Sequence, residues 1–143
     1  MANERIGSAL PFRGAGANYI EKIDTTGKQL IAADSGKTFL CHQNASAICL
    51  VNLPSISESI AGWNAKFIIT TAASNDVDIV GGTADTMSGT EISNTCVGFA
   101  LVDKVTFASG ASTVGDYVEV VSDGSKMYTT CVSVAAGGAT SAG

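Results

Sequence analysis

The sequence predicts an all-β domain, an antiparallel β-sandwich of the jelly-roll kind. Short apolar and β-branched runs recur along most of the 143 residues, separated by Gly, Asn, Ser and Pro. In residues 30–54, two such runs follow the turn-forming Asp34-Ser35-Gly36 and are closed by Pro54. Asp123-Gly124, between two β-rich runs, is the strongest hairpin signal. Roughly nine short strands at near-regular spacing favour a sandwich or barrel.

The individual elements follow in order along the chain. Residues 1–18 contain several glycines and no apolar periodicity, which predicts an extended N-terminal arm. The expected strands are 19–23, 29–32, 38–41, 47–53, 65–71, 77–80, 96–107 with a break near Asp103, 117–122 and 126–134. One helical turn is expected at 55–62 and a Gly/Ser/Thr-rich loop at 81–93. The β-sandwich domain therefore spans 19–134, and 135–143 is expected to be a flexible tail.

The last hairpin shows which side chains should enter the core. A two-residue turn at 123–124 would place Val120 opposite Met127. Alternation along both strands then puts one apolar set on a common face: Val118, Val120, Met127 and Cys131. The other face is polar and aromatic, so it is expected to be exposed or to form an interface.

Composition and charge limit the functions that are possible. Charged residues make up 15% of the chain, below the roughly 25% of typical soluble domains, which suggests a surface partly covered by another subunit. The net charge of −5 argues against nucleic acid as a partner. Residues 1–28 hold four bases and three acids, so a slightly basic arm precedes an acidic body. With no membrane-length apolar run and no signal peptide, synthesis in a host cytoplasm is expected.

The cysteines and the single histidine give little sign of chemistry. Cys41, Cys49, Cys96 and Cys131 include no closely spaced metal-binding pair, so buried, reduced thiols are favoured over disulfides or a metal site. His42 stands beside Cys41 at a strand end, where adjacent side chains point to opposite faces. An ordinary structural position is therefore favoured over a catalytic one for His42.

The remaining candidate sites also have simpler explanations. Asp76 and Asp78 share a face and, with Asp85 or Glu91, are calcium candidates, but solvated turn acids are favoured. The Gly81-Gly82-Thr83 segment lacks the lysine of a phosphate loop. The acceptor sequence that begins at Asn44 is expected to stay unglycosylated. Trp63 is expected in the core or an interface rather than under a sugar. No cofactor, metal site or catalytic residue is predicted.

Several segments together resemble a known group of proteins. AADSGK at 32–37, NLP at 52–54, AGW-x3-FI at 61–68 and GDYVEVVSDGSKMY at 115–128 are similar to the small β-domains of tailed-phage structural proteins, above all capsid decoration (cement) proteins and related fibre heads. The resemblance spans residues 20–134. It implies a homotrimer, without enzymatic activity, on the outside of the capsid where major capsid protein subunits meet.

The arm is the predicted point of attachment in this interpretation. It holds two arginines and three apolar side chains able to order on contact with a capsid: Arg5, Ile6, Leu10, Phe12 and Arg13. The location expected is thus the virion, on the capsid surface. A receptor- or carbohydrate-binding fibre head is the alternative, and a hydrolase is a more distant third possibility because no nucleophile motif is present.

Overall fold

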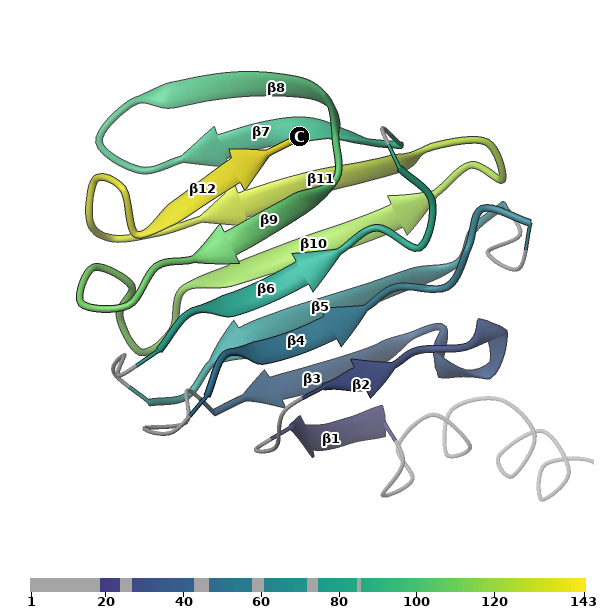
Figure 1. The fold of residues 1–143 in the computed structure, drawn as a ribbon, viewed down its shortest axis with the longest axis horizontal. Coiled ribbons are helices and arrows are strands. Elements are labelled where there is room, and N and C mark those ends of the chain that lie inside the picture. Colours follow the sequence, from purple (N-terminus) through teal and green to yellow (C-terminus); the bar gives the residue numbers. More distant parts are fainter. Residues whose placement is uncertain (1–18, 24–26, 43–46, 58–60, 72–74, 85) are drawn as a thin grey trace, which may run out of the picture.

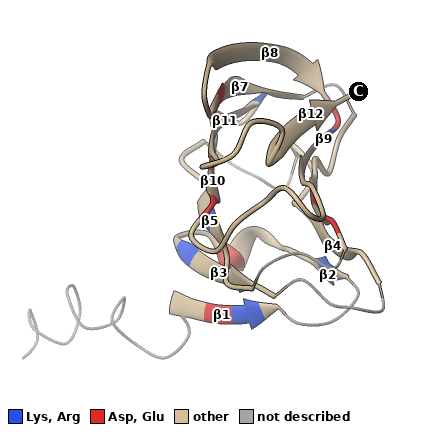
Figure 2. Ribbon diagram, turned by 90° about the vertical axis from the view of Figure 1, so that its left-hand side faces the viewer, with Lys and Arg blue, Asp and Glu red and all other residues tan. Residues whose placement is uncertain are grey.

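The computed structural model describes residues 19–23, 27–42, 47–57, 61–71, 75–84 and 86–143. These residues form two β-sheets packed face to face, seen from the front in Figure 1 and along their edges in Figure 2. The seven-stranded sheet consists, in spatial order, of β1 (Ile20–Ile23), β3 (Lys37–Cys41), β5 (Asn64–Ile69), β10 (Tyr117–Ser122), β11 (Met127–Val132), β7 (Met87–Ile92) and β8 (Cys96–Val102). The five-stranded sheet consists of β12 (Ala139–Ala142), β9 (Lys104–Phe107), β6 (Val77–Val80), β4 (Cys49–Asn52) and β2 (Lys28–Gln29). The prediction of an all-β protein is confirmed.

From β1 to β6 the chain passes from one sheet to the other at every strand. β1, β3 and β5 lie side by side in the seven-stranded sheet, and β2, β4 and β6 do so in the five-stranded sheet. Each of these pairs is parallel, because the intervening strand carries the chain back across the opposite sheet. The β10–β11 hairpin is inserted between β5 and β7. Both sheets are therefore mixed, and the purely antiparallel jelly-roll sandwich predicted from the sequence is not confirmed.

Two segments that were expected to lack strands contain them. β7 lies within the expected loop 81–93, and β12 lies within the expected tail 135–143. In β7, a Cβ on Gly89 would stand 1.9 Å from the carbonyl oxygen of Thr129, so only glycine allows this approach to β11. β12 pairs with β9 in antiparallel register. The tail interpretation is thus wrong for the β12 residues.

Other boundaries agree more closely with the sequence. The expected break near Asp103 separates β8 from β9, where the chain changes sheets. The strand expected at 29–32 is wrong in part, since β2 ends at Gln29 and Ala32–Asp34 forms a 3-10 turn. The helical turn expected at 55–62 lies partly outside the described residues. The arm 1–18 lies wholly outside them.

The β10–β11 hairpin keeps the predicted faces but not the predicted register. Val120 lies opposite Thr129, and Ser122 opposite Met127, so the loop has four residues instead of two. Oδ1 of Asp123 accepts hydrogen bonds from the main-chain N–H groups of Ser125 and Lys126, both at 2.7 Å, which stabilises the longer turn. A shift of two residues preserves the alternation, so Val118, Val120, Met127 and Cys131 are all buried as expected.

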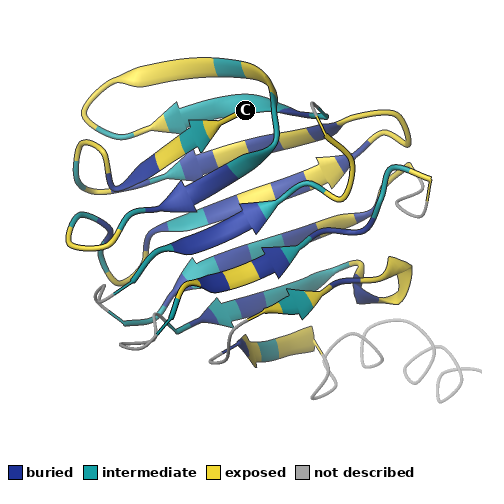
Figure 3. Ribbon diagram, in the orientation of Figure 1, coloured by how far each residue is buried: buried dark blue, intermediate teal, exposed yellow. Residues whose placement is uncertain are grey.

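The core lies between the sheets and draws on both of them. Phe39 of β3 stacks on Phe67 of β5, with ring centroids 5.3 Å apart. The largest fully buried side chains are Trp63, Phe39, Phe67, Phe107, Leu30, Leu53, Ile69, Ile79, Met87 and Met127. In Figure 3 the buried positions run as alternating bands along the central strands, whereas β8 is largely exposed.

Candidate interaction surfaces

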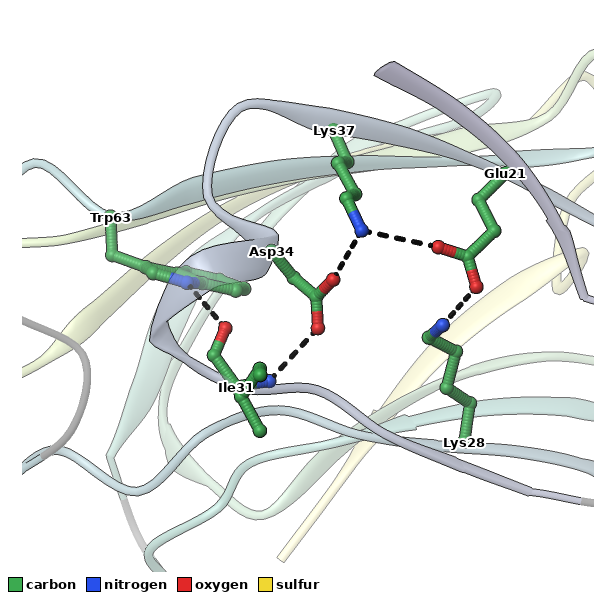
Figure 4. Close-up of polar contacts among 6 residues, drawn as sticks. All are labelled: Glu21, Lys28, Ile31, Asp34, Lys37 and Trp63. Carbon is green, nitrogen blue, oxygen red and sulfur yellow. Dashed lines mark hydrogen bonds and ion pairs between the residues drawn. The ribbon is translucent and has the colours of Figure 1, made fainter. Parts of the chain in front are cut away.

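The end of the sandwich formed by β1 and β2 is closed by charged side chains. Glu21 binds Lys28 and also Lys37, whose Nζ lies 3.3 Å from Oε2 (Figure 4). Lys37 also binds Asp34 at 2.5 Å, and Asp34 accepts the N–H of Ile31 at 3.0 Å. Lys28 lies over the Phe39 ring, 5.7 Å from its centroid. Four charges therefore cover the core at the two edge strands, a feature that discourages pairing with other chains.

We expect this network to make stability sensitive to acid. The Lys28 hydrogen bond lowers the pKa of Glu21; burial raises the pKa of Asp34, but hydrogen bonds from Lys37 and Ile31 outweigh it and lower that pKa overall. Because both folded-state pKa values lie below those of the unfolded chain, the contribution is complete above about pH 5 and is lost as the pH falls below about 4, through the lowered folded-state pKa values. Urea unfolding should show that Lys37→Gln lowers stability more at neutral pH than at about pH 3.

Lys66→Gln is the matched control for this pH effect. Lys66 binds Glu119 at 2.9 Å, but both side chains are more exposed than those of the network, so solvent screens the pair. The loss of stability caused by Lys66→Gln should be small and nearly independent of pH. Equal losses for Lys37→Gln at neutral and acid pH would contradict the proposed role of the network.

The opposite end of the sandwich is apolar. β8 is the other edge of the seven-stranded sheet, and its sequence, CVGFALV, contains no charged residue. Val97 and Leu101 are each 52% exposed, and β8 carries no coloured segment in Figure 2. Phe99 and Val102 turn inward and pack against the core. Proteins usually protect edge strands with charge or proline, so this edge is a candidate contact surface.

A second candidate is the outer face of the seven-stranded sheet. Val121 and Tyr128 are register partners, and both are about half exposed. Lys66 lies over the Tyr117 ring, 4.0 Å from its centroid, beside its ion pair with Glu119. A shallow depression of about 260 Å³ lies over this face, lined by Gly36, Lys37, Thr38, Asn64, Ala65, Lys66, Glu119, Val120 and Val121. The face thus combines exposed apolar side chains with a paired charge. The hairpin analysis predicted that this face is polar, aromatic and outside the core, and its Glu119, Val121 and Tyr128 are exposed.

The carboxylates considered for calcium are engaged in structural contacts. Asp78 accepts from Thr106 Oγ1 at 2.6 Å and from Lys104 Nζ at 2.9 Å on the five-stranded sheet. Asp76 accepts from the N–H of Ser109 at 2.7 Å. Asp78 is buried within β6, so its interpretation as a solvated turn acid was wrong. Within the described part of the chain, no three His, Cys, Asp or Glu side chains lie close enough together to hold a metal ion.

Glu91, another calcium candidate, and Gly82, from the segment compared with a phosphate loop, also have structural explanations. Burial raises the pKa of Glu91, whose register partner in β11 is Cys131. Asp85 lies outside the described residues. A Cβ on Gly82 would stand 2.4 Å from the carbonyl oxygen of Leu53, so this glycine permits close packing of two chain segments.

Three of the four thiols are buried and one is exposed. Cys41, Cys49 and Cys131 are buried as expected, and the prediction is wrong for Cys96, which is exposed in β8. All four are free thiols. Burial raises the pKa of Cys131 to about 12 and also raises the pKa of Cys41. Cys96 is therefore the most accessible thiol for chemical labelling.

His42 lies directly after β3, and Trp63 lies in the core. The main-chain N–H of His42 donates to the carbonyl of Ile23 at 2.9 Å, at the end of β3. Trp63 is buried, and its Nε1 donates to the carbonyl of Ile31 at 3.3 Å (Figure 4). The expectation that Trp63 belongs to the core is confirmed.

The structure does not test the predicted docking residues. Arg5, Ile6, Leu10, Phe12 and Arg13 all lie outside the described residues, as does Asn44. The charged network and the β8 edge were not identified from the sequence. A signal for the edge is nevertheless present, because no charged residue stands between Glu91 and Asp103.

Comparison with known proteins gave no match. No protein family matches this chain, and neither the curated proteins nor the solved structures include one that does. Among the described residues, no helix has the length and apolar character needed to cross a membrane.

Proposed function

We propose that this protein is a virion structural protein that binds the outer surface of a phage capsid as a decoration (cement) protein, acting as a homotrimer. The observation that carries this proposal is the contrast between the two ends of the sandwich. One end is closed by four charged side chains, and the other presents an uncharged, exposed edge strand. Such asymmetry suits a subunit that contacts other subunits in one direction.

The rest of the described surface agrees with an assembly role. Val121 and Tyr128 add exposed apolar area on the outer face of the seven-stranded sheet. An interface that joins subunits permanently buries apolar groups of this kind and excludes charge from its centre. The resemblance of residues 20–134 to phage decoration domains supports the capsid as the partner. The arm residues would then supply the attachment to the major capsid protein.

Deleting residues 1–18 is expected to abolish most capsid binding while leaving the fold and the trimer intact. Burying Phe12 in a pocket would contribute about 2 kcal/mol per subunit. Three arms on one trimer would multiply that effect through effective concentration. Co-sedimentation with empty capsids measures attachment, and analytical ultracentrifugation measures the trimer.

Two results would contradict this assignment. If the truncated protein decorates capsids as well as the full chain, attachment runs through the β-sandwich and not through the arm. If the full chain sediments as a stable monomer at micromolar concentration, the homotrimer is wrong. Replacing Phe12 alone by Ala is the finer control, because it keeps Arg5, Arg13 and the arm's length.

A carbohydrate- or receptor-binding fibre head is the second candidate. The shallow depression over Asn64, Lys66 and Glu119 favours it, since amide, ammonium and carboxylate groups hydrogen-bond to sugar hydroxyls. A glycan array with the full chain separates the two functions. Glycan binding without capsid binding would favour the fibre head; capsid binding without glycan binding would favour decoration.

A further inference from the structure

The main-chain groups on the outer side of β8 can be assigned from its partner strand. The N–H of Ser133 donates to the carbonyl of Ile92 at 2.9 Å, so Ile92 faces β11 and not β8. Because successive residues of a strand direct these groups to opposite sides, Glu91 and Gly89 face β8. Their register partners Val97 and Phe99 therefore face β7. The remaining residues of this stretch, Cys96, Gly98 and Ala100, direct their main-chain N–H and C=O groups to the outer side, where no described strand pairs.

The regular part of this edge ends at Ala100. Leu101 has φ 56°, a left-handed conformation that is rare outside glycine. The register with β7 is also irregular between Met87 and Gly89, opposite this point. This irregularity bends the strand away, as bulges do. The straight, pairable edge is therefore Cys96–Ala100, with Gly98 at its centre.

The side chains along this segment are arranged symmetrically about Gly98. The small residues Cys96 and Ala100 lie at its ends, and the large Val97 and Phe99 flank the glycine. Two antiparallel copies centred on Gly98 would place small opposite small and large opposite large, with no side chain at the axis. They would also bring no charges together, because the nearest, Glu91 and Asp103, lie outside the segment. A neutral contact matters for a chain of net charge −5, since its copies repel one another elsewhere.

We propose that the outer edge of β8 pairs in antiparallel register with β8 of a second copy, across a two-fold axis at Gly98. Cys96 then lies opposite Ala100 of the second copy, and Val97 opposite its Phe99. The main-chain groups of Cys96, Gly98 and Ala100 form the hydrogen bonds between the copies. The contact joins two seven-stranded sheets into one continuous sheet.

The size of this contact indicates where it acts. Five paired residues span about 17 Å, and with a depth near 10 Å the strip covers roughly 170 Å², against about 800 Å² per partner in a stable complex. The pair is therefore weak between free copies, and it becomes populated at high protein concentration or where another contact keeps the copies close. The inference rests on the proposed function for this setting, in which β8 links neighbouring trimers on the capsid and effective concentration supplies the missing affinity.

Disulfide trapping tests the pairing directly. In Ala100→Cys, the new thiol would lie opposite Cys96 of the second copy, with Cα atoms about 5.5 Å apart, a separation that a disulfide accepts. Within one chain the same two residues are about 14 Å apart, so no internal bridge forms. Gly98→Cys would bridge to itself at the axis, and a Cβ there meets only the Gly89 carbonyl oxygen at 3.9 Å. Leu101→Cys, exposed but beyond the regular edge, is the matched control.

We expect oxidation of the concentrated native protein to yield covalent dimers of Ala100→Cys and Gly98→Cys, severalfold more than of Leu101→Cys or the unmodified chain. The proposed pairing is overturned if neither variant gives a higher yield of covalent dimer than Leu101→Cys. It is also overturned if the unmodified chain links readily through Cys96, since antiparallel pairing keeps the two Cys96 residues about 14 Å apart. If Gly98→Cys fails to fold, Ala100→Cys decides alone. Capsid binding by the reduced Ala100→Cys protein is measured separately; it persists if only the β8 contact is wrong and is absent if the proposed function is wrong.

Discussion

Replacing Asp116 by alanine is expected to lower the free energy of unfolding by about 3–5 kcal/mol. Its carboxylate is 1% exposed and accepts four hydrogen bonds. Oδ2 binds the N–H of Thr113 at 2.9 Å and Oγ of Ser133 at 2.8 Å; Oδ1 binds the N–H of Val134 and Oγ1 of Thr113, both at 3.0 Å. These bonds join the loop before β10 to the end of β11. Alanine would remove the acceptor of the main-chain N–H groups of Thr113 and Val134. Oγ of Ser133 would keep only its other acceptor, the carbonyl of Ala135 at 3.2 Å.

Two variants control this prediction. Asp116→Asn keeps the shape and one acceptor oxygen, so its loss in urea unfolding should be smaller than that of the alanine variant. Glu119→Gln removes a charge from an exposed carboxylate with a single ion pair, and its effect should be below about 1 kcal/mol. A stability for Asp116→Ala within about 1 kcal/mol of the unmodified protein would show that water replaces the lost acceptor.

Phe67→Ala should have a similarly large effect, about 3–5 kcal/mol. Phe67 has no exposed surface, and its ring stacks on Phe39 with an angle of 14° between the planes. It lies in register with Phe39 of β3 on one side and Val118 of β10 on the other. Removing the ring leaves a cavity at β5, which pairs with the parallel strand β3 on one side and with β10 of the inserted hairpin on the other. The cavity cannot be filled unless these neighbouring strands move.

Val134→Ala is the control for the core prediction, because Val134 is 75% exposed and should tolerate truncation with less than about 0.5 kcal/mol of loss. Phe67→Leu keeps most of the buried volume and should lose less than Phe67→Ala. If Phe67→Ala unfolds at the same urea concentration as Val134→Ala, the described core does not hold the two sheets together.

The sequence was sufficient for most strand positions but not for their pairing. β6 and β10 begin and end as predicted, because β-prone residues bounded by turn residues mark the limits of a strand. In β10 the alternation of apolar residues also specifies the buried face, whereas in β6 Asp78 is buried beside Val77 and Ile79. The same alternation does not say which strand lies beside which. A strand that returns through the opposite sheet gives parallel neighbours, and no local pattern distinguishes that path from a hairpin.

The errors have local physical causes. β7 contains Ser88-Gly89-Thr90, which is typical of a loop, yet Gly89 is needed because Thr129 lies against it. The hairpin register shifted by two because the Asp123 side chain stabilises a longer turn than Asp-Gly alone predicts. The charged network joins residues from β1, β2 and β3, and such tertiary proximity is not written in sequence spacing.

The central claim is that this chain is a structural subunit on the outside of a phage capsid. The most direct test of this proposal is a cryo-electron microscopy reconstruction of empty phage capsids incubated with the full chain. The account predicts added density on the outer surface, three copies of the two-sheet sandwich around each attachment point. Capsids whose outer surface is unchanged by saturating protein would contradict it.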